Sequence, residues 1–376
     1  MRLPEEKLTK YLDALPEQGI PSVDCIVYEN HRMIYRHMAG CVDAEKKVPV
    51  RADQRYLMFS MTKVQTMTAL MQLVEAGKIS LEDEVSKYLP AYGSLKVRDA
   101  EGERELKTPM KVWHLASMQS GLDYDLSRPG ILRVLEEKGM QATTRELVDA
   151  FPESPLVFEP GTHFQYSLSH DVVAAIIEVA SGMSFGEYLK KQIWEPLGMK
   201  DTFFAKPVND GLERLAQQFI AGEQGIVPME QTCNYQLSER YESGGAGLVS
   251  CTEDYAALAD ALSCGGVSSE GVRILQPETV EQIKKNLLCD AGLTDIATTM
   301  GRKGYGYGCG MQVLLHPEEI GSSAPAGIFG WDGAAGACIQ MDTVSKRSFV
   351  YVQHVRNCGL AYGTIHPDLR DLIFGS

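Results

Sequence analysis

Alternating and helical hydrophobic patterns divide the chain into regions of different character. A short amphipathic helix is predicted around 5–15. The stretch SVDCIVYENHRMIYRHMAG then carries two apolar runs around a turn at 29–31, which predicts a β-hairpin. From Ser60 to Ala76 apolar residues recur at every third or fourth position, which predicts a buried helix that Gly77 ends.

The middle of the chain is predicted to be mostly helical. SHDVVAAIIEVASG is typical of a buried helix. A serine or threonine followed three residues later by an acidic residue predicts a capped helix start. This pattern occurs at Ser80 with Asp83, Thr143 with Glu146, and Ser184 with Glu187.

Strand patterns return in the last third of the chain. GGAGLVS predicts a strand or tight turn before a helix that begins near Thr252, and GYGYGCGMQVLL predicts one strand. AGACIQMD and SFVYVQHV predict two more around TVSKR, and HPDLRDLIFGS predicts a closing helix. Strands at both ends and helices between them predict an α+β fold. We expect residues 1–80 and 240–376 to form one discontinuous domain, and 81–239 a mainly helical lobe.

Composition and charge narrow the possible partners. The 376 residues are 44% hydrophobic and 23% charged, which is typical of a globular protein with a substantial core. The net charge of -14 would repel phosphate, so we expect neither nucleic acid nor an anionic membrane as a partner. No secretory signal is visible in the first residues, and we expect a cytoplasmic location. The nine cysteines show no metal-ligand spacing, which predicts free thiols and no metal site.

Ser60 and Lys63 are the first candidates for chemistry. Residues three apart on a helix share a face, and both stand in the apolar run YLMFSMTKVQTMTAL. A serine hydroxyl needs a base to become a nucleophile. Burial can lower the pKa of a lysine from about 10.4 toward neutrality, and it could then act as that base. The alternative is an N-cap serine beside a lysine that extends to solvent.

Two later elements could complete such a site. Tyr166, in FQYSLS, could relay protons if its phenol lay near an ammonium group, or could be a core residue. GWDGAAG, which begins at Gly330, opens a late strand. Its small residues would let a substrate lie close to the backbone, and an exposed N–H there could stabilise an oxyanion. Its alternative is a β-turn leading into a core strand.

In this order, the elements SMTK, YSL and WDG resemble those of the serine β-lactamase and penicillin-binding-protein superfamily, in its class C-like branch, which includes the family VIII carboxylesterases. Supporting stretches are HLASMQSGL, FEPGTHFQYS, WEPLGMKDTFF and GGAGLVSCTEDYA, so the resemblance covers most of the chain. It implies an antiparallel sheet flanked by helices with an inserted all-helical lobe. It also implies a site between the two parts that needs no metal or cofactor.

The resemblance also implies roles for the matching residues. Ser60 would form an acyl-enzyme, and Lys63 would help to deprotonate it. Tyr166 would be a general base or proton relay. The backbone N–H groups of Ser60 and Ala334 would form the oxyanion hole.

Departures from the family pattern bear on the substrate. Leu168 stands where penicillin-recognising members usually carry an asparagine, and Trp331 where they usually carry lysine or histidine. Leu168 cannot form a hydrogen bond, Trp331 favours apolar contact, and the neighbouring Asp332 disfavours an anionic substrate, so these changes favour a small neutral ester. Gly333 is one of the small residues that would let this substrate lie close to the backbone. A carboxylesterase is therefore predicted. The alternatives are a β-lactamase or D-amino-peptidase, acyl transfer to an acceptor other than water, and a non-catalytic binding homologue. The sequence does not predict an oligomeric state.

Three other residues could belong to a site. His170 and Asp171 could form a dyad with Ser60, but their position favours a role at a helix N-terminus. His354, on a late strand, could line a cleft or be a core histidine with its hydrogen bonds satisfied.

Overall fold

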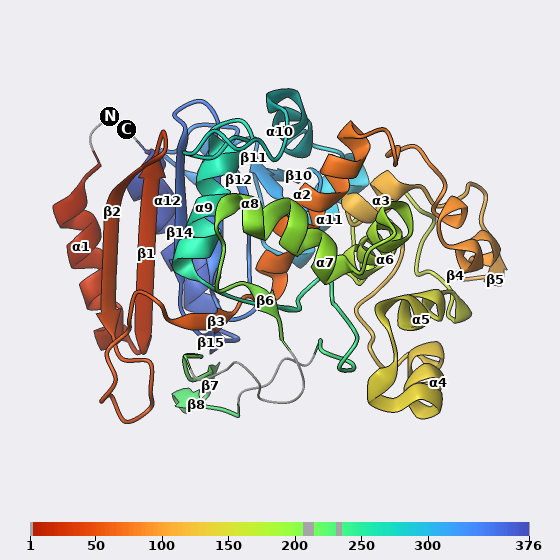
Figure 1. Cartoon of the computed structure of the whole chain (residues 1–376), viewed down its shortest axis with the longest axis horizontal. Coiled ribbons are helices and arrows are strands. Elements are labelled where there is room, and N and C mark those ends of the chain that lie inside the picture. The colour runs from red at the N-terminus through yellow and green to blue at the C-terminus, as the bar shows by residue number, and fades with distance from the viewer. Residues whose placement is uncertain (1–2, 206–213, 231–234, 376) are drawn as a thin grey trace.

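A seven-stranded antiparallel sheet organises the computed structural model, which describes residues 3–205, 214–230 and 235–375 (Figure 1). Its strand order is β10-β11-β12-β13-β14-β1-β2, so the first two strands of the chain pair with strands from its last quarter. The strands are β1 (Ser22–Glu29), β2 (Arg32–Gly40), β10 (Tyr305–Tyr307), β11 (Gln312–Leu314), β12 (Phe329–Asp332), β13 (Cys338–Asp342) and β14 (Arg347–Val352).

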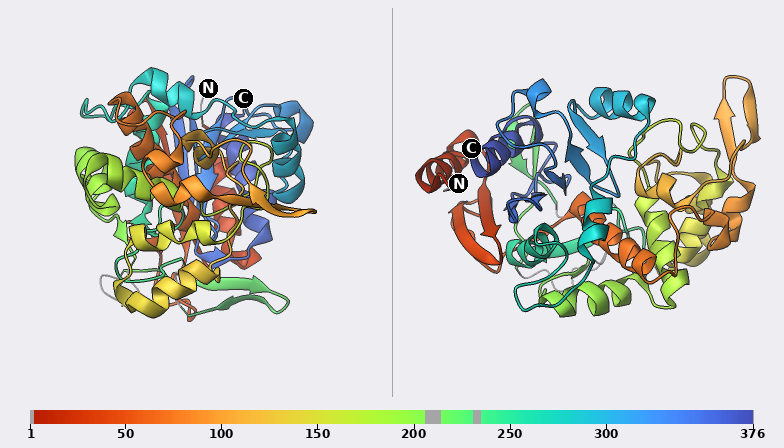
Figure 2. Two further views of the ribbon diagram at one scale, coloured as in Figure 1. Left: turned by 90° about the vertical axis from the view of Figure 1, so that its right-hand side faces the viewer. Right: turned by 90° about the horizontal axis from the view of Figure 1, so that it is seen from above.

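Helices cover both faces of this sheet (Figure 2). On one face α1 packs against β2 and α12, and on the other α9 packs against β1, β13 and β14. The period of two in β1 explains the division, because Val23, Cys25 and Val27 join the core under α1 and α12 while Ile26 joins the opposite core. The helices are α1 (Glu5–Ala14), α9 (Thr252–Ser263) and α12 (His366–Phe374).

Helices from the rest of the chain form a lobe beside the sheet, with α6 at its centre in contact with α2, α3, α5 and α7 (Figure 1). The expectation of an all-helical lobe is wrong in one detail, because β4 and β5 form a hairpin within it. The helices here are α2 (Thr62–Glu75), α3 (Val112–Ala116), α4 (Pro129–Lys138), α5 (Thr144–Asp149), α6 (Ser169–Ser181), α7 (Phe185–Leu189), α8 (Glu195–Leu197), α10 (Pro277–Ile283) and α11 (Asp290–Thr299), and the hairpin strands are β4 (Lys96–Asp99) and β5 (Gly102–Glu105).

Two small sheets complete the fold. The first has the order β3-β9-β6 and the second β15-β7-β8, so β6, β7 and β8, which lie inside 81–239, pair with strands outside that range. The predicted domain boundaries at 80 and 239 stay a prediction. The strands are β3 (Arg55–Leu57), β6 (Phe203–Phe204), β7 (Phe219–Gly222), β8 (Gly225–Pro228), β9 (Leu248–Cys251) and β15 (Val355–Arg356).

Two of the three predicted helix caps are confirmed. Thr143 begins α5 and Ser184 begins α7, each in a reciprocal capping box with the glutamate three residues on. The prediction at Ser80 is wrong. There the Asp83 carboxylate accepts the Ser80 N–H at 2.8 Å and closes a turn, so the same residue pattern stabilises a bend without a helix behind it.

The late strands differ from the prediction at one point. GYGYGCGMQVLL forms two antiparallel strands, β10 and β11, because residues 308–311 turn between them. No single helix in the described ranges is long and apolar enough to cross a membrane. The segments Ser169–Ser181 and Phe185–Leu197 meet that test only as a pair bent by 75°.

Candidate active site

Ser60 lies in a single turn of 3-10 helix, Phe59–Met61, which leads into α2. The predicted helix therefore begins two residues later than expected. Phe59 has a φ of 46°, a left-handed conformation that strains a bulky residue and is typical of functional turns. Its ring is fully buried, with Tyr235 at its edge and the Arg356 guanidinium 5.3 Å from its centre. Within this turn, Phe59 and Met61 are buried and Ser60 is partly exposed.

Lys63 lies directly beside Ser60 at the first turn of α2. Its Nζ is 3.2 Å from Ser60 Oγ and 3.2 Å from the Tyr124 hydroxyl. It also donates a 2.7 Å hydrogen bond to the Gly245 carbonyl. The side chain is fully buried, so the alternative of a lysine extending to solvent is wrong.

Burial changes the protonation of Lys63. Loss of hydration lowers its pKa to about 7, while the negative charges of Asp171 and then Asp332 act in the opposite direction. A lysine with this pKa is partly neutral near pH 7. It can therefore accept the proton of a hydroxyl that lies 3.2 Å away.

Tyr166 completes a compact group with Ser60 and Lys63. Lys63 Nζ lies 4.5 Å from the centre of its ring, and the Trp331 indole N–H donates a 3.0 Å hydrogen bond to its hydroxyl. Burial raises the pKa of Tyr166 well above 10, and interactions with Ser60 and Trp331 only partly offset this. The phenol therefore stays protonated at neutral pH, which favours a proton relay over a phenolate base.

Trp331 and Asp332 are placed differently from the expectation. Trp331 is only 1% exposed, and its ring packs edge-on against Tyr307. Asp332 forms an ion pair with the buried Arg302. The guanidinium therefore offsets the charge of Asp332, which was expected to repel an anionic substrate.

Gly333 brings the end of β12 onto the turn that carries Ser60. A Cβ at this position would overlap the Met58 carbonyl oxygen. The small residue was expected to make room for substrate, but the space is filled by the backbone before the nucleophile. Ala334, the next residue, packs in a small cluster with Phe59, and its N–H has no acceptor among the residues that the structure describes. Its position beside the Ser60 turn suits an oxyanion donor.

Comparisons with known proteins identify the family. The family model named Beta-lactamase matches residues 7–357. The chain belongs to the beta-lactamase family. Esterase EstB from Burkholderia gladioli is 28% identical over 388 residues, which cover 96% of this chain and 92% of the esterase.

Solved structures show the same fold. The structure of EstCE1, described as a hydrolase with promiscuous acyltransferase activity, has a TM-score of 0.80 at 24% identity and covers 98% of both chains. Simvastatin synthase from Aspergillus terreus has a TM-score of 0.81 at 20% identity, covering 99% of this chain and 98% of the synthase. The predicted family and fold class are confirmed, and the protein is a serine hydrolase of the beta-lactamase family.

Leu168 and His354 are two further residues that the sequence analysis singled out. Leu168 is buried in the main core, and its predicted contact with substrate stays a prediction. His354 is a core histidine, as one alternative had it, because its Nε2 accepts the Leu57 N–H and its Nδ1 lies 2.9 Å from the Ala216 carbonyl oxygen. Neither residue provides a base for Ser60.

His170 and Asp171 do not form a dyad with Ser60. His170 Nε2 lies 3.3 Å from the Ala116 carbonyl oxygen, and Asp171 accepts hydrogen bonds from Tyr241 and Ser243. Both side chains are fully buried at the start of α6.

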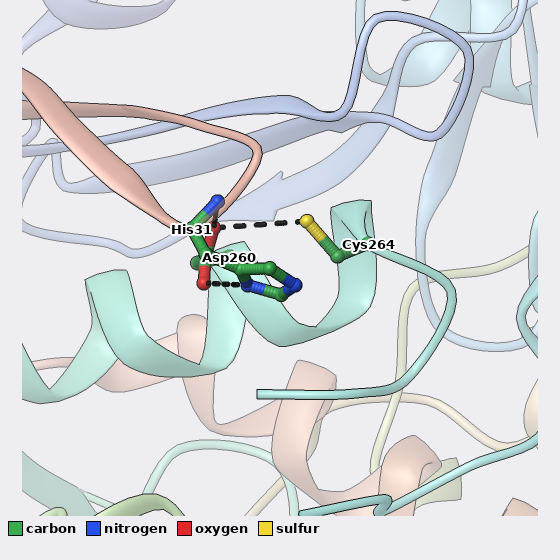
Figure 3. Close-up of side chains that lie close together, drawn as sticks. All are labelled: His31, Asp260 and Cys264. Carbon is green, nitrogen blue, oxygen red and sulfur yellow. Dashed lines mark hydrogen bonds and ion pairs between the residues drawn. The ribbon is translucent and has the colours of Figure 1, made fainter. Parts of the chain in front are cut away.

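One group of side chains could hold a metal ion in the described part of the chain (Figure 3). His31, at the tip of the β1–β2 hairpin, faces Asp260 on α9 and Cys264, which directly follows that helix. Both carboxylate oxygens are already occupied, because the His31 N–H donates to Oδ1 at 3.0 Å and the ring Nδ1 lies 2.8 Å from Oδ2. This group fastens the hairpin to α9. The eight cysteines in the described residues are free, as predicted, and Cys233 lies outside them.

Tyr124 is the site residue that sequence reasoning missed. It bonds Lys63 and stacks on Tyr166 with ring centres 5.7 Å apart, and Tyr235 lies at its edge. The one signal in the sequence was its place two residues after the familiar stretch HLASMQSGL. A tyrosine there is not distinguishable from a core residue until the fold brings it to Lys63.

Proposed function

We propose that this protein is a carboxylesterase that forms an acyl-enzyme on Ser60 and acts on small neutral esters. The observation that carries the proposal is the fully buried Lys63, with a pKa lowered to about 7 and Nζ 3.2 Å from Ser60 Oγ. The esterase relative, which aligns over nearly the whole chain, supports the reaction class.

In the proposed acylation, neutral Lys63 takes the Ser60 proton while Oγ attacks the ester carbonyl carbon. The N–H groups of Ser60 and Ala334 donate hydrogen bonds to the carbonyl oxygen and stabilise the negative charge that develops on it. The tetrahedral intermediate then expels the alcohol. The Lys63 ammonium returns the proton to the leaving oxygen through the Tyr166 hydroxyl, and Lys63 is neutral again.

Deacylation repeats these steps with water as the nucleophile. A water molecule gives a proton to Lys63, directly or through Tyr166, and its oxygen attacks the acyl carbon. Collapse of the second intermediate releases the carboxylic acid, and Oγ of Ser60 regains its proton.

Two features support a neutral substrate. Trp331 occupies the first position of the third motif and carries no charge, and Leu168 offers no hydrogen bond at the position that follows Tyr166 by two. The apolar residues therefore carry this part of the proposal.

The proposal is tested by labelling and by turnover. A fluorophosphonate probe should add to Ser60 in the folded protein, read by peptide mass spectrometry, and should not add to Ser60→Ala. Hydrolysis of p-nitrophenyl acetate and butyrate should be lost in the same variant. Absence of labelling in folded wild-type protein would favour the non-catalytic alternative, and rapid turnover of nitrocefin with slow ester hydrolysis would favour a β-lactamase.

Acyl transfer is a second candidate. The similarity in fold to EstCE1, whose description includes acyltransferase activity, favours testing it. Added alcohol acceptors should then form new esters from p-nitrophenyl butyrate, measured by mass spectrometry. If the acid is the sole product at every acceptor concentration, water is the acceptor.

A further inference from the structure

A buried carboxylate lies close to Lys63. Asp171, in the first turn of α6, is fully buried. Its Oδ1 accepts hydrogen bonds from Ser243 Oγ at 2.6 Å and from the Tyr241 hydroxyl at 2.8 Å. Its Oδ2 has no side-chain hydrogen-bond partner among the described residues, and the backbone N–H of Gly245 is the donor near this carboxylate. Two hydroxyl groups thus hold Oδ1 in place, while Oδ2 accepts no hydrogen bond from a side chain.

Gly245 shows where the second oxygen lies. The position that a Cβ of Gly245 would occupy is 2.7 Å from Asp171 Oδ2 and 3.4 Å from Lys63 Nζ. The Tyr124 hydroxyl is 3.0 Å from the same point, and the Gly245 carbonyl accepts a hydrogen bond from Lys63 Nζ. The carboxylate oxygen and the amine therefore approach each other across a residue that has no side chain.

We propose that Asp171 is a positioning residue for Lys63. The negative charge of Asp171 makes the buried amine of Lys63 able to gain and lose a proton beside Ser60. Ser243 and Tyr241 fix the carboxylate on its far side, so that its other oxygen faces Lys63. The consequence for catalysis rests on the proposed function, but the effect on Lys63 itself does not.

The other charges around Lys63 leave this role to Asp171. Asp332, on β12, also faces Lys63, but it is already paired with Arg302. His170, on α6, is fully buried, and burial together with the nearby Lys63 lowers its pKa well below 6.5, so it stays neutral at neutral pH.

The two aromatic neighbours of Lys63 add no charge. Tyr124 and Tyr166 present their rings to Lys63, and the Tyr124 hydroxyl also contacts its Nζ. Burial raises the pKa of both phenols well above 10. Burial also raises the pKa of Asp171. The hydrogen bond from Ser243, the charge of Lys63, the hydrogen bond from Tyr241 and the backbone N–H of Gly245 oppose that effect. Asp171 is thus the nearby acid whose charge no arginine or other ion pair cancels among the described residues.

The primary experiment measures the pKa of Lys63 in full-length protein without any substrate. The ε-carbon resonance of ¹³C-labelled lysine, identified by its loss in Lys63→Ala, is titrated in the wild type and in Asp171→Asn. The asparagine keeps the shape and an acceptor for Ser243 and Tyr241 but removes the charge. We expect the pKa of Lys63 to fall by about one unit, as loss of a nearby opposite charge does in a buried site. An unchanged pKa in folded Asp171→Asn would overturn the proposal.

A matched control separates charge from the cost of placing an asparagine in a core. Asp254 is another buried acid, on α9, and accepts hydrogen bonds from Thr202 and from the backbone of Asp201. Asp254→Asn should leave the Lys63 titration unmoved. If Asp171→Asn does not fold, Tyr241→Phe keeps the carboxylate and removes one donor, and a smaller fall in the Lys63 pKa is expected. No fall in that variant would then count against the proposal.

A second readout links this effect to chemistry. The rate of fluorophosphonate addition to Ser60 should reach its plateau at lower pH in Asp171→Asn than in the wild type. If Lys63 titrates at a lower pH in the variant while wild-type Ser60 is never labelled, the positioning role holds and the proposed function fails. If Ser60 is labelled and neither the titration nor the labelling profile moves, the proposed function holds and the positioning role fails.

Discussion

At the scale of single residues, the protonation of Lys63 decides when Ser60 can react. Lys63 is a base only when neutral, and its pKa is lowered to about 7. We expect kcat/KM for p-nitrophenyl butyrate to rise through pH 7 and level off above it, and to fall about tenfold per pH unit on the acid side. The raised pKa of Tyr166 adds no ionisation below pH 10. A pH–rate profile, corrected for spontaneous hydrolysis, measures this.

The matched variant for this profile is Lys63→Arg, because a guanidinium keeps the charge but holds its proton throughout the accessible range. Activity should drop by roughly 10²–10⁴-fold at every pH, and the rise through pH 7 should disappear. A profile in Lys63→Arg that keeps the wild-type shape would show that another group is the base.

Trp331 could act through its hydrogen bond to Tyr166 or through direct contact with substrate, and a substitution can distinguish these two roles. Trp331→Phe removes the N–H that reaches the Tyr166 hydroxyl at 3.0 Å but keeps an aromatic ring. Since a net hydrogen bond is worth about 1 kcal/mol, kcat should fall about five- to tenfold with little change in KM. Steady-state kinetics on p-nitrophenyl butyrate measure both constants.

A rise in KM at constant kcat would contradict that expectation and support direct contact of Trp331 with substrate. Trp194→Phe is the control, because Trp194 is a buried indole that donates to Gln65. Its loss should lower stability and leave kcat unchanged.

The sequence predicted the residues whose side chains carry distinctive chemistry. Ser60 and Lys63 were recognisable because a serine and a lysine at helical spacing are unusual in an apolar run, and the structure places them 3.2 Å apart. Tyr124 was not, and Asp171 was considered only for a dyad with Ser60 or a role at a helix N-terminus, because both residues meet Lys63 only after folding. The ion pair of Asp332 was not predicted for the same reason, since Arg302 is far from it in sequence.

At the scale of elements, local hydrogen bonding explains which predictions held. The capping boxes at Thr143 and Ser184 precede short helices, α5 and α7, whose apolar side chains are buried within the lobe. The same spacing at Ser80 closes a turn, in which Asp83 accepts the Ser80 N–H and also binds Lys87 and the Tyr88 hydroxyl. A capping pattern alone therefore does not settle whether a helix follows it.

The contact between β12 and the Ser60 turn is the element-scale feature on which the site depends. Gly333→Ala would place a methyl group against the Met58 carbonyl oxygen, which cannot move without disturbing the turn. We expect loss of at least 10²-fold in kcat/KM, the scale of losing an oxyanion donor, because the Ala334 N–H shifts relative to Ser60. Kinetics and circular dichroism of the variant would measure activity and fold together.

Gly359→Ala is the control for that substitution, because a Cβ at Gly359 meets nothing within 4 Å. Its activity should match the wild type. Near-normal activity in Gly333→Ala would mean that β12 can move away from the turn without affecting the oxyanion site.

At the scale of the whole molecule, the sheet joins the two ends of the chain. The sequence predicted strands at both ends, but not their order, because β1 pairs with β14 through a register that local patterns do not encode. It also predicted one strand where β10 and β11 form two. The family resemblance supplied what periodicity could not, namely the antiparallel sheet and the inserted lobe.

This architecture separates a supporting face of the sheet from the face near the site. Leu369 of α12 is fully buried in the core that α12 shares with α1, while Ser60, Lys63 and Trp331 border the opposite core. Leu369→Ala should therefore lower the free energy of unfolding by about 2–5 kcal/mol through the cavity it leaves. Urea unfolding measures this loss, with Val344→Ala, at a side chain that is 86% exposed, as the control that should change little. Below the unfolding transition, kcat of Leu369→Ala should equal that of the wild type, because the rigid sheet lies between the cavity and the nucleophile. A parallel fall in kcat under conditions where the variant is fully folded would show that the two faces are coupled.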